Sequence, residues 1–219
     1  MDWPYMLLNI FELTACIAGF VCWNKIRHTY WRWFPVYLAI IVLAELTGEY
    51  LLHVEKNLEL CINLYSYFTI PAEFIFFYWV FYKYFNSIGS NNNRWPLYAA
   101  AIYLICWLID SLYIKGKMKL LFDSFSYTMG NILLLVLILS FFIKFIKSEE
   151  LLKYRSNNMF WVCLGLLVFY LGSLPFYGIR TTLYRQYRDI FYLYWYIQFG
   201  LGYLMYLFFT ISFIWGKPK

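Results

Sequence analysis

Residues 120–143 read LLFDSFSYTMGNILLLVLILSFFI and form the most apolar long segment of the sequence. It contains one acidic residue and no lysine or arginine, and Lys119 and Lys144 bound it. A helix of about 20 apolar residues spans the hydrocarbon core of a bilayer, whereas a barrel strand needs only about 10. The stretch is too long for such a strand and shows no sustained alternation of polar and apolar residues. It therefore predicts a transmembrane helix.

Six further apolar runs of similar length follow the same pattern. The seven predicted spans are residues 4–23, 34–53, 62–82, 96–114, 120–143, 159–178 and 190–215. They occupy most of the chain, and no connecting loop exceeds about 15 residues, which leaves no room for a separate soluble domain. We expect an all-α polytopic membrane helix bundle with seven transmembrane helices, in which residues 1–219 form a single integral membrane domain.

The composition agrees with a membrane protein. Of the 219 residues, 63% are apolar, 25% are aromatic and 14% are charged. The mean hydropathy is +0.58. Soluble domains carry about 25% charged residues, and a soluble fold of this length could not cover so much apolar surface. The composition excludes a soluble or disordered protein and makes the lipid bilayer the main partner.

Basic residues in the loops predict the orientation. With the N-terminus outside, eleven basic residues lie inside and seven outside, which favours an N-out, C-in topology. The net charge of +6 is spread over short loops, which suits an anionic leaflet and does not form the continuous stripe of a nucleic-acid-binding protein. The inner residues are Lys25, Arg27, Arg32, Lys83, Arg94, Lys144, Lys147, Lys153, Arg155, Lys217 and Lys219. The outer ones are Lys56, Lys115, Lys117, Lys119, Arg180, Arg185 and Arg188.

Acidic residues inside the spans are the main candidates for function. A charged side chain at the centre of a membrane helix costs roughly 2.5 to 3.5 kcal/mol, so an acid there calls for a functional explanation. Glu45, Glu49 and His53 are spaced by four residues and share one helix face. In the N-out topology this face ends at the outer side. We predict an outward-facing cavity lined by Glu45, Glu49, His53, Glu73, Asp110 and Asp123.

An alternative is that the acids only join helices through hydrogen bonds, which average below about 1 kcal/mol in membranes. Glu12, in the first span, belongs to the same set of embedded acids. Hydroxyl and amide groups that could serve as partners are Tyr65, Tyr67, Tyr127, Ser124, Ser126, Thr128 and Asn131. Pro71 lies two residues before Glu73, and its missing N–H predicts a free carbonyl and a kink beside that acid.

Signatures of known chemistry are missing from the sequence. His28 and His53 are the only histidines, no G-x-S-x-G motif is present, and the last span has no lysine for a retinal Schiff base. We therefore assign no catalytic residue, no metal ligand and no cofactor, and the sequence does not predict an enzyme. A metal hydrolase using His53, Glu49 and an outer aspartate remains an alternative.

Part of the chain resembles a known group of proteins. The motifs are Phe160-Trp161, Gly165-Leu166-Leu167 and Phe169-Tyr170-Leu171-Gly172-Ser173, together with Glu73-Phe74. They resemble small, uncharacterised bacterial membrane proteins with seven transmembrane helices. The resemblance implies seven helices and location in a bacterial inner (plasma) membrane. It implies no activity.

These observations favour an integral membrane protein that handles a small solute or protons, in transport or sensing. Carboxylates attract cations, and tyrosine and tryptophan rings add cation–π surfaces, so a small cationic or polar solute is the expected ligand. The first alternative is a non-catalytic signalling or structural membrane subunit that binds a membrane or cytoplasmic protein partner. The second is an intramembrane hydrolase.

Overall fold

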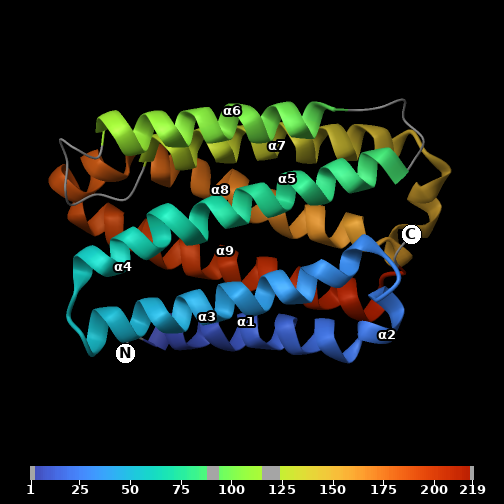
Figure 1. The fold of residues 1–219 in the computed structure, drawn as a ribbon, viewed down its shortest axis with the longest axis horizontal. Coiled ribbons are helices and arrows are strands. Elements are labelled where there is room, and N and C mark those ends of the chain that lie inside the picture. The colour runs from blue at the N-terminus through green and yellow to red at the C-terminus, as the bar shows by residue number, and fades with distance from the viewer. Residues whose placement is uncertain (1–2, 88–93, 115–123, 218–219) are drawn as a thin grey trace. The chain divides into compact units, whose positions relative to one another are not determined.

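The computed structural model describes residues 3–87, 94–114 and 124–217, and this part of the chain consists of helices joined by short connections, without a β-strand. The long helices are α1 (Trp3–Val21), α3 (Trp33–His53), α5 (Ile70–Ser87), α6 (Trp95–Ile109), α7 (Ser124–Ile146), α8 (Asn158–Gln186) and α9 (Arg188–Trp215) (Figure 1). The short elements are α2 (Trp23–Ile26), η1 (Tyr30–Arg32), α4 (Leu58–Leu64), η2 (Tyr65–Thr69), η3 (Asp110–Ile114) and η4 (Glu149–Ser156). Of the short elements, η2 and η3 are π-helical turns.

Seven helical segments of the described chain are long and apolar enough to cross a membrane, which confirms the all-α prediction. The third span is longer than the predicted 62–82, because α4, η2 and α5 join into one helical segment, Leu58–Ser87. Glu59 lies in its first turn and Lys83 lies four residues before its end, so both side chains can reach interfacial water. The exposed apolar side chains of these spans contact the lipid bilayer.

The helices form two compact units, which are described separately. One consists of residues 1–39 and 135–219, and the other of residues 40–134. We call them the terminal unit and the central unit. Helices α3 and α7 each contribute one part to each unit.

In the terminal unit, α8 and α9 form a long hairpin joined at Tyr187, and α1 packs along α9 (Figure 1). The hydroxyl of Tyr203 on α9 donates to the Pro4 carbonyl of α1 at 2.8 Å. The ring of Phe34, at the start of α3, meets Phe209 of α9 edge to face, with centroids 5.2 Å apart. Aromatic contacts therefore hold the start of α3 against α9.

Helix α1 has two faces, and its single acid lies on the inner one. Residues Glu12, Ala15, Cys16 and Gly19 are buried, and Met6, Ile10, Leu13 and Ile17 are exposed. Both sets recur every three or four residues, as on the two faces of an amphipathic helix. The exposed face of α1 meets lipid, and Glu12 belongs to the packed interior of the terminal unit.

In the central unit, α5, α6 and α7 meet around Gly130. The ring of Phe74 on α5 lies 4.9 Å from that of Tyr103 on α6 and 5.5 Å from that of Tyr127 on α7. The hydroxyl of Tyr78 donates to the Gly130 carbonyl at 2.9 Å. The rings of Phe74 and Tyr103 leave no room for a side chain at this position.

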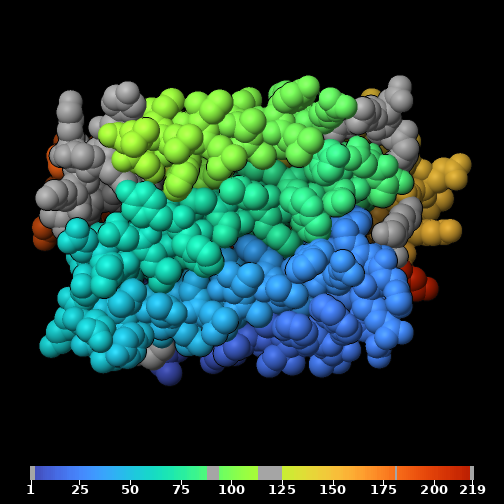
Figure 2. Space-filling model, viewed as in Figure 1, coloured from blue at the N-terminus to red at the C-terminus, as the bar shows by residue number. Residues whose placement is uncertain are grey.

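The outer side of α6 faces lipid. Figure 2 shows this helix, in yellow-green, at the surface of the molecule, and its exposed side chains include Leu97, Ile105 and Leu108. Its inner side carries Tyr103, which is fully buried. Helix α6 therefore has one face toward lipid, and its opposite face carries Tyr103 into the packed interior of the central unit.

Candidate functional site

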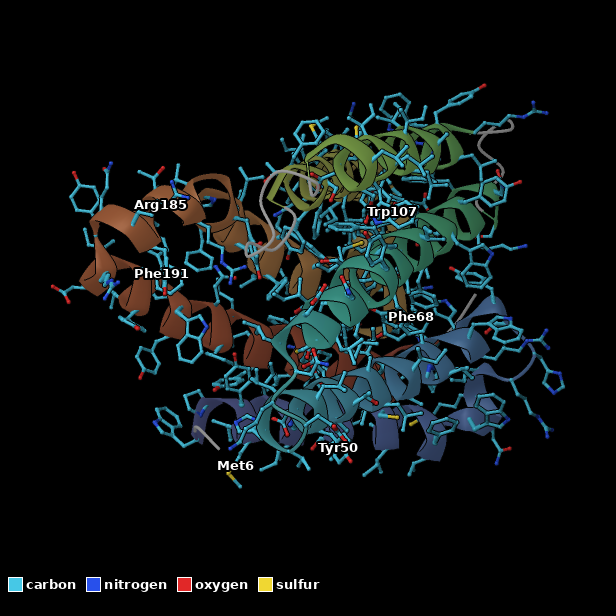
Figure 3. The ribbon with its side chains drawn as sticks, turned by 60° about the vertical axis from the view of Figure 1, so that its left-hand side comes forward. Met6, Tyr50, Phe68, Trp107, Arg185 and Phe191 are labelled. Carbon is cyan, nitrogen blue, oxygen red and sulfur yellow. The ribbon has the colours of Figure 1, made fainter. Side chains whose placement is uncertain are left out.

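The π-helical turn η2 has a local cause in the sequence. The N–H of Ile70 donates to the Tyr65 carbonyl, five residues earlier. The next bond of the same kind would need the N–H of residue 71, which is a proline and has none. Ser66 therefore lacks a main-chain donor for its carbonyl, and the indole Nε1–H of Trp107 on α6 donates to it at 3.1 Å. Trp107 is labelled in Figure 3.

This arrangement corrects the expected position of the distortion. The sequence predicted a free carbonyl and a kink beside Glu73, but α5 runs as a regular α-helix from Ile70 through Glu73. The carbonyl freed by Pro71 belongs to Ser66, because the hydrogen bonds that a proline removes reach back along the helix. The irregular turn therefore lies next to Glu45 and not next to Glu73.

Glu45 on α3 contacts this turn directly. The hydroxyl of Tyr65, the first residue of η2, donates to Oε2 of Glu45 at 2.7 Å. The Tyr65 ring lies over Gly48, where a Cβ atom would come within 2.6 Å of the hydroxyl oxygen. The thiol of Cys61 on α4 donates to the Gly48 carbonyl at 3.6 Å. Gly48 thus permits the close approach that the Glu45–Tyr65 hydrogen bond requires.

Glu49 and His53 continue the same face of α3, as the spacing predicted. Glu49 is half-buried one turn beyond Glu45, and the two carboxyl groups interact electrostatically. His53 is exposed in the last turn of α3, with Nδ1 3.2 Å from the Glu49 carbonyl oxygen. The face therefore runs from a half-buried acid to an exposed histidine at the helix end. We call Glu45, Glu49 and Tyr65 the Glu45 site.

Glu73 lies at a different level of the central unit. It is half-buried on α5, eight residues after Tyr65 in the same helical segment. At 1.5 Å per residue this separates the two positions by about 12 Å along the helix. The part of Glu73 in a cavity with Glu45 and Glu49 stays a prediction.

Asp110 binds the start of α7. It is buried in the first position of η3, and its Oδ2 accepts the main-chain N–H of Ser126 at 3.1 Å. Ser126 is in the first turn of α7, where main-chain N–H groups have no partner within the helix and carry a partial positive charge. Asp110 thus caps a neighbouring helix. Asp123, the remaining predicted site residue, lies outside the described residues.

The Glu45 site combines two carboxyl groups with the hydroxyl and ring of Tyr65. Tyr67, also in η2, packs edge to face with Trp107 of α6, with centroids 6.2 Å apart. Within the described ranges, no group of three or more His, Cys, Asp or Glu residues could hold a metal ion. The site can accept hydrogen bonds, exchange protons and attract a cation.

Sequence reasoning included Tyr65 among the hydrogen-bond partners of the acids, and the hydrogen bond to Glu45 confirms that partner. It missed Gly48, Ser66 and Trp107. Ser66 could have been found from its position five residues before Pro71. Nothing in the sequence of α6 distinguishes Trp107 from the other aromatic residues, because its role depends on how α6 packs.

Fold and site together define a polytopic α-helical membrane protein. Comparisons with protein-family models, with curated proteins and with solved structures find no match. The resemblance to small bacterial seven-helix proteins therefore stays a prediction.

We expect Trp107→Phe to destabilise the protein by about 1–3 kcal/mol, the penalty of a buried acceptor that loses its donor. The substitution keeps an aromatic ring beside Tyr67 and removes only the N–H that serves Ser66. Thermal unfolding in detergent measures the change.

Trp161→Phe is the matched control. Its Nε1 donates to the Arg155 carbonyl at 3.0 Å in an exposed position, where water can replace the lost bond. Equal losses of stability in the two variants would contradict a special role for Trp107.

Proposed function

We propose that the protein binds a small cationic or polyhydroxylated solute, or protons, at the Glu45 site during transport or sensing. In the N-out topology the face of α3 that carries Glu45, Glu49 and His53 opens toward the outside. The resemblance to bacterial proteins supports a bacterial inner membrane as the location.

The observation that carries the proposal is the 2.7 Å hydrogen bond between Tyr65 and Glu45 at a π-helical turn inside a membrane span. Such turns are rare and frequently lie at functional sites. Ionisable residues inside a span are functional by default, because their insertion is unfavourable.

The presence of Glu49 beside Glu45 favours ligand binding over a purely structural hydrogen bond between helices. One acid and one tyrosine suffice for an interhelical hydrogen bond. Glu49, one turn from Glu45, adds like-charge repulsion of about 0.2–0.5 kcal/mol on a helix face. A cation or a proton shared by the two carboxyl groups relieves this repulsion. The ring of Tyr65, which donates to Glu45, adds an aromatic surface for an organic cation.

Glu45→Gln tests the proposal. In thermal-shift measurements on purified protein, we expect tetramethylammonium, methylammonium or a monosaccharide to stabilise the wild type and not the variant, because a ligand stabilises the state that binds it. In proteoliposomes, a pH-sensitive dye reports proton movement. We expect the variant to lose the ligand response or the proton flux and to unfold near the wild-type temperature.

Glu59→Gln is the control for a change of charge alone, since Glu59 is exposed in the first turn of α4. It should behave as the wild type. Wild-type ligand response and proton flux in Glu45→Gln would contradict the proposal.

A signalling or structural subunit is the second candidate, favoured by one surface of the terminal unit. In η4, Leu152 is 88% exposed and Leu151 is exposed beside it, next to Lys153 and Arg155. An exposed apolar pair flanked by basic residues suits an acidic protein partner. Pull-down from mild detergent should then recover a stoichiometric partner that Leu152→Glu loses. Consistent recovery of a lone monomer would argue against this role.

A further inference from the structure

Two buried hydroxyl groups beside Asp110 have no hydrogen-bond partner among the described residues. They are Oγ of Ser111, which follows Asp110 in η3, and Oγ of Ser126. Ser126 is only 1% exposed, and its main-chain N–H is bonded to the Asp110 carboxylate, so its side chain lies beside that group. Buried hydroxyls are nearly always hydrogen-bonded, and an exception indicates a missing water or ion.

Among the described residues, the Asp110 carboxylate is paired with the main-chain N–H of Ser126. The start of a helix carries roughly half a positive charge. It therefore compensates only part of the charge of an ionised carboxylate. Buried charge is strongly unfavourable unless it is compensated.

We propose that Asp110, with the hydroxyls of Ser111 and Ser126, binds a small monovalent cation, with sodium as the probe. Carboxylate and hydroxyl oxygens are the ligands that hard cations prefer. The three groups come from η3 and from the first turn of α7, which the Ser126–Asp110 hydrogen bond holds together.

The carboxylate of Asp110 and the two serine hydroxyls favour a monovalent over a divalent cation. One carboxylate and neutral hydroxyls give a neutral site with a monovalent ion and leave an excess charge with a divalent one. In the described part of the chain, Asp110 does not belong to a group of three His, Cys, Asp or Glu side chains that could hold a metal ion. The cation site is separate from the Glu45 site and does not depend on the solute proposed there.

The experiment uses the full chain, purified in detergent, and compares sodium chloride with choline chloride at constant ionic strength. We expect sodium to raise the unfolding temperature of the wild type in a saturable manner, as a ligand of the folded state does. Direct binding of radioactive sodium should give the same apparent affinity. Lithium and potassium report the size preference.

Ser126→Ala is the principal variant, because it removes the hydroxyl and leaves the main-chain bond to Asp110. We expect its apparent sodium affinity to fall by at least about tenfold, while its stability in choline stays equal or rises, since a buried unpartnered hydroxyl is gone. Ser126→Thr keeps a hydroxyl and should restore binding. Asp110→Asn should lose sodium binding as well.

Two controls separate this site from other effects. Ser140→Ala, on the same helix, removes a hydroxyl that already donates to the Val136 carbonyl, and should bind sodium as the wild type does. Glu45→Gln should also keep sodium binding, so that failure of the solute site and failure of the cation site are distinguishable. A wild type without a sodium-specific response, or equal responses in Ser126→Ala and wild type, would overturn the proposal and leave a bound water as the explanation.

Discussion

Gly130→Ala is expected to destabilise the protein by about 1–3 kcal/mol, although it adds a single methyl group. The new Cβ would lie 2.9 Å from two carbons of the Phe74 ring and 2.9 Å from one carbon of the Tyr103 ring. Both residues are fully buried and pack against each other, so neither ring can move without disturbing α5 or α6. Thermal unfolding and the fraction of folded protein after purification measure the effect.

Gly200→Ala is the control for this substitution. Gly200 lies within α9, and nothing in the structure comes within 4 Å of a Cβ placed there. Alanine is favoured over glycine in a helix by up to about 1 kcal/mol, so this variant should be neutral or slightly stabilised. If both alanine variants unfolded at the same temperature, the packing described around Gly130 would be wrong.

Gly48→Ala is expected to weaken ligand binding strongly and to leave the fold intact. A Cβ atom at this position would lie 2.6 Å from the Tyr65 hydroxyl oxygen and 2.9 Å from Cε2 of its ring. The ring must move away, which breaks the hydrogen bond to Glu45. We expect ligand affinity to fall at least about tenfold, with a small change in unfolding temperature, because only one side chain near its tip has to shift.

Tyr65→Phe provides the comparison for Gly48→Ala. It removes the same hydrogen bond without adding an atom, so the two variants should lose affinity by similar factors. Their combination should be no worse than either alone, since both remove one interaction. A ligand response that survives in Gly48→Ala would show that the Glu45–Tyr65 contact does not form the binding site.

The fold could be predicted from the sequence because a bilayer imposes simple requirements. Apolar runs of about 20 residues, such as 120–143, must be helical, since a membrane span has to satisfy its own main-chain hydrogen bonds. Because α3 is helical, the four-residue spacing of Glu45, Glu49 and His53 places them on one face. The ends of the spans were less predictable, because helices such as α8 continue into the interface.

The details of the site could not be predicted, because they depend on contacts between helices. Hydropathy gives the depth of a residue and not the direction in which its helix faces. The pairing of Trp107 with Ser66 requires α6 to pack against η2, and the sequence does not specify that neighbour. Asp110 illustrates the same point. Its depth in the membrane suggested a ligand-binding acid, and in the structure its carboxylate also accepts a main-chain N–H at the start of α7. No local sequence pattern predicts that hydrogen bond.

Chemical modification of Glu45 tests the central claim most directly, which is that a polar solute reaches this membrane-embedded carboxyl group. Proteoliposomes are treated with a water-soluble carbodiimide and a small primary amine, and the modified residues are identified by mass spectrometry. We expect an amide at Glu45 in the wild type, and protection of Glu45 by tetramethylammonium, which cannot form an amide. Modification of the exposed Glu59 without any modification of Glu45 would contradict the claim.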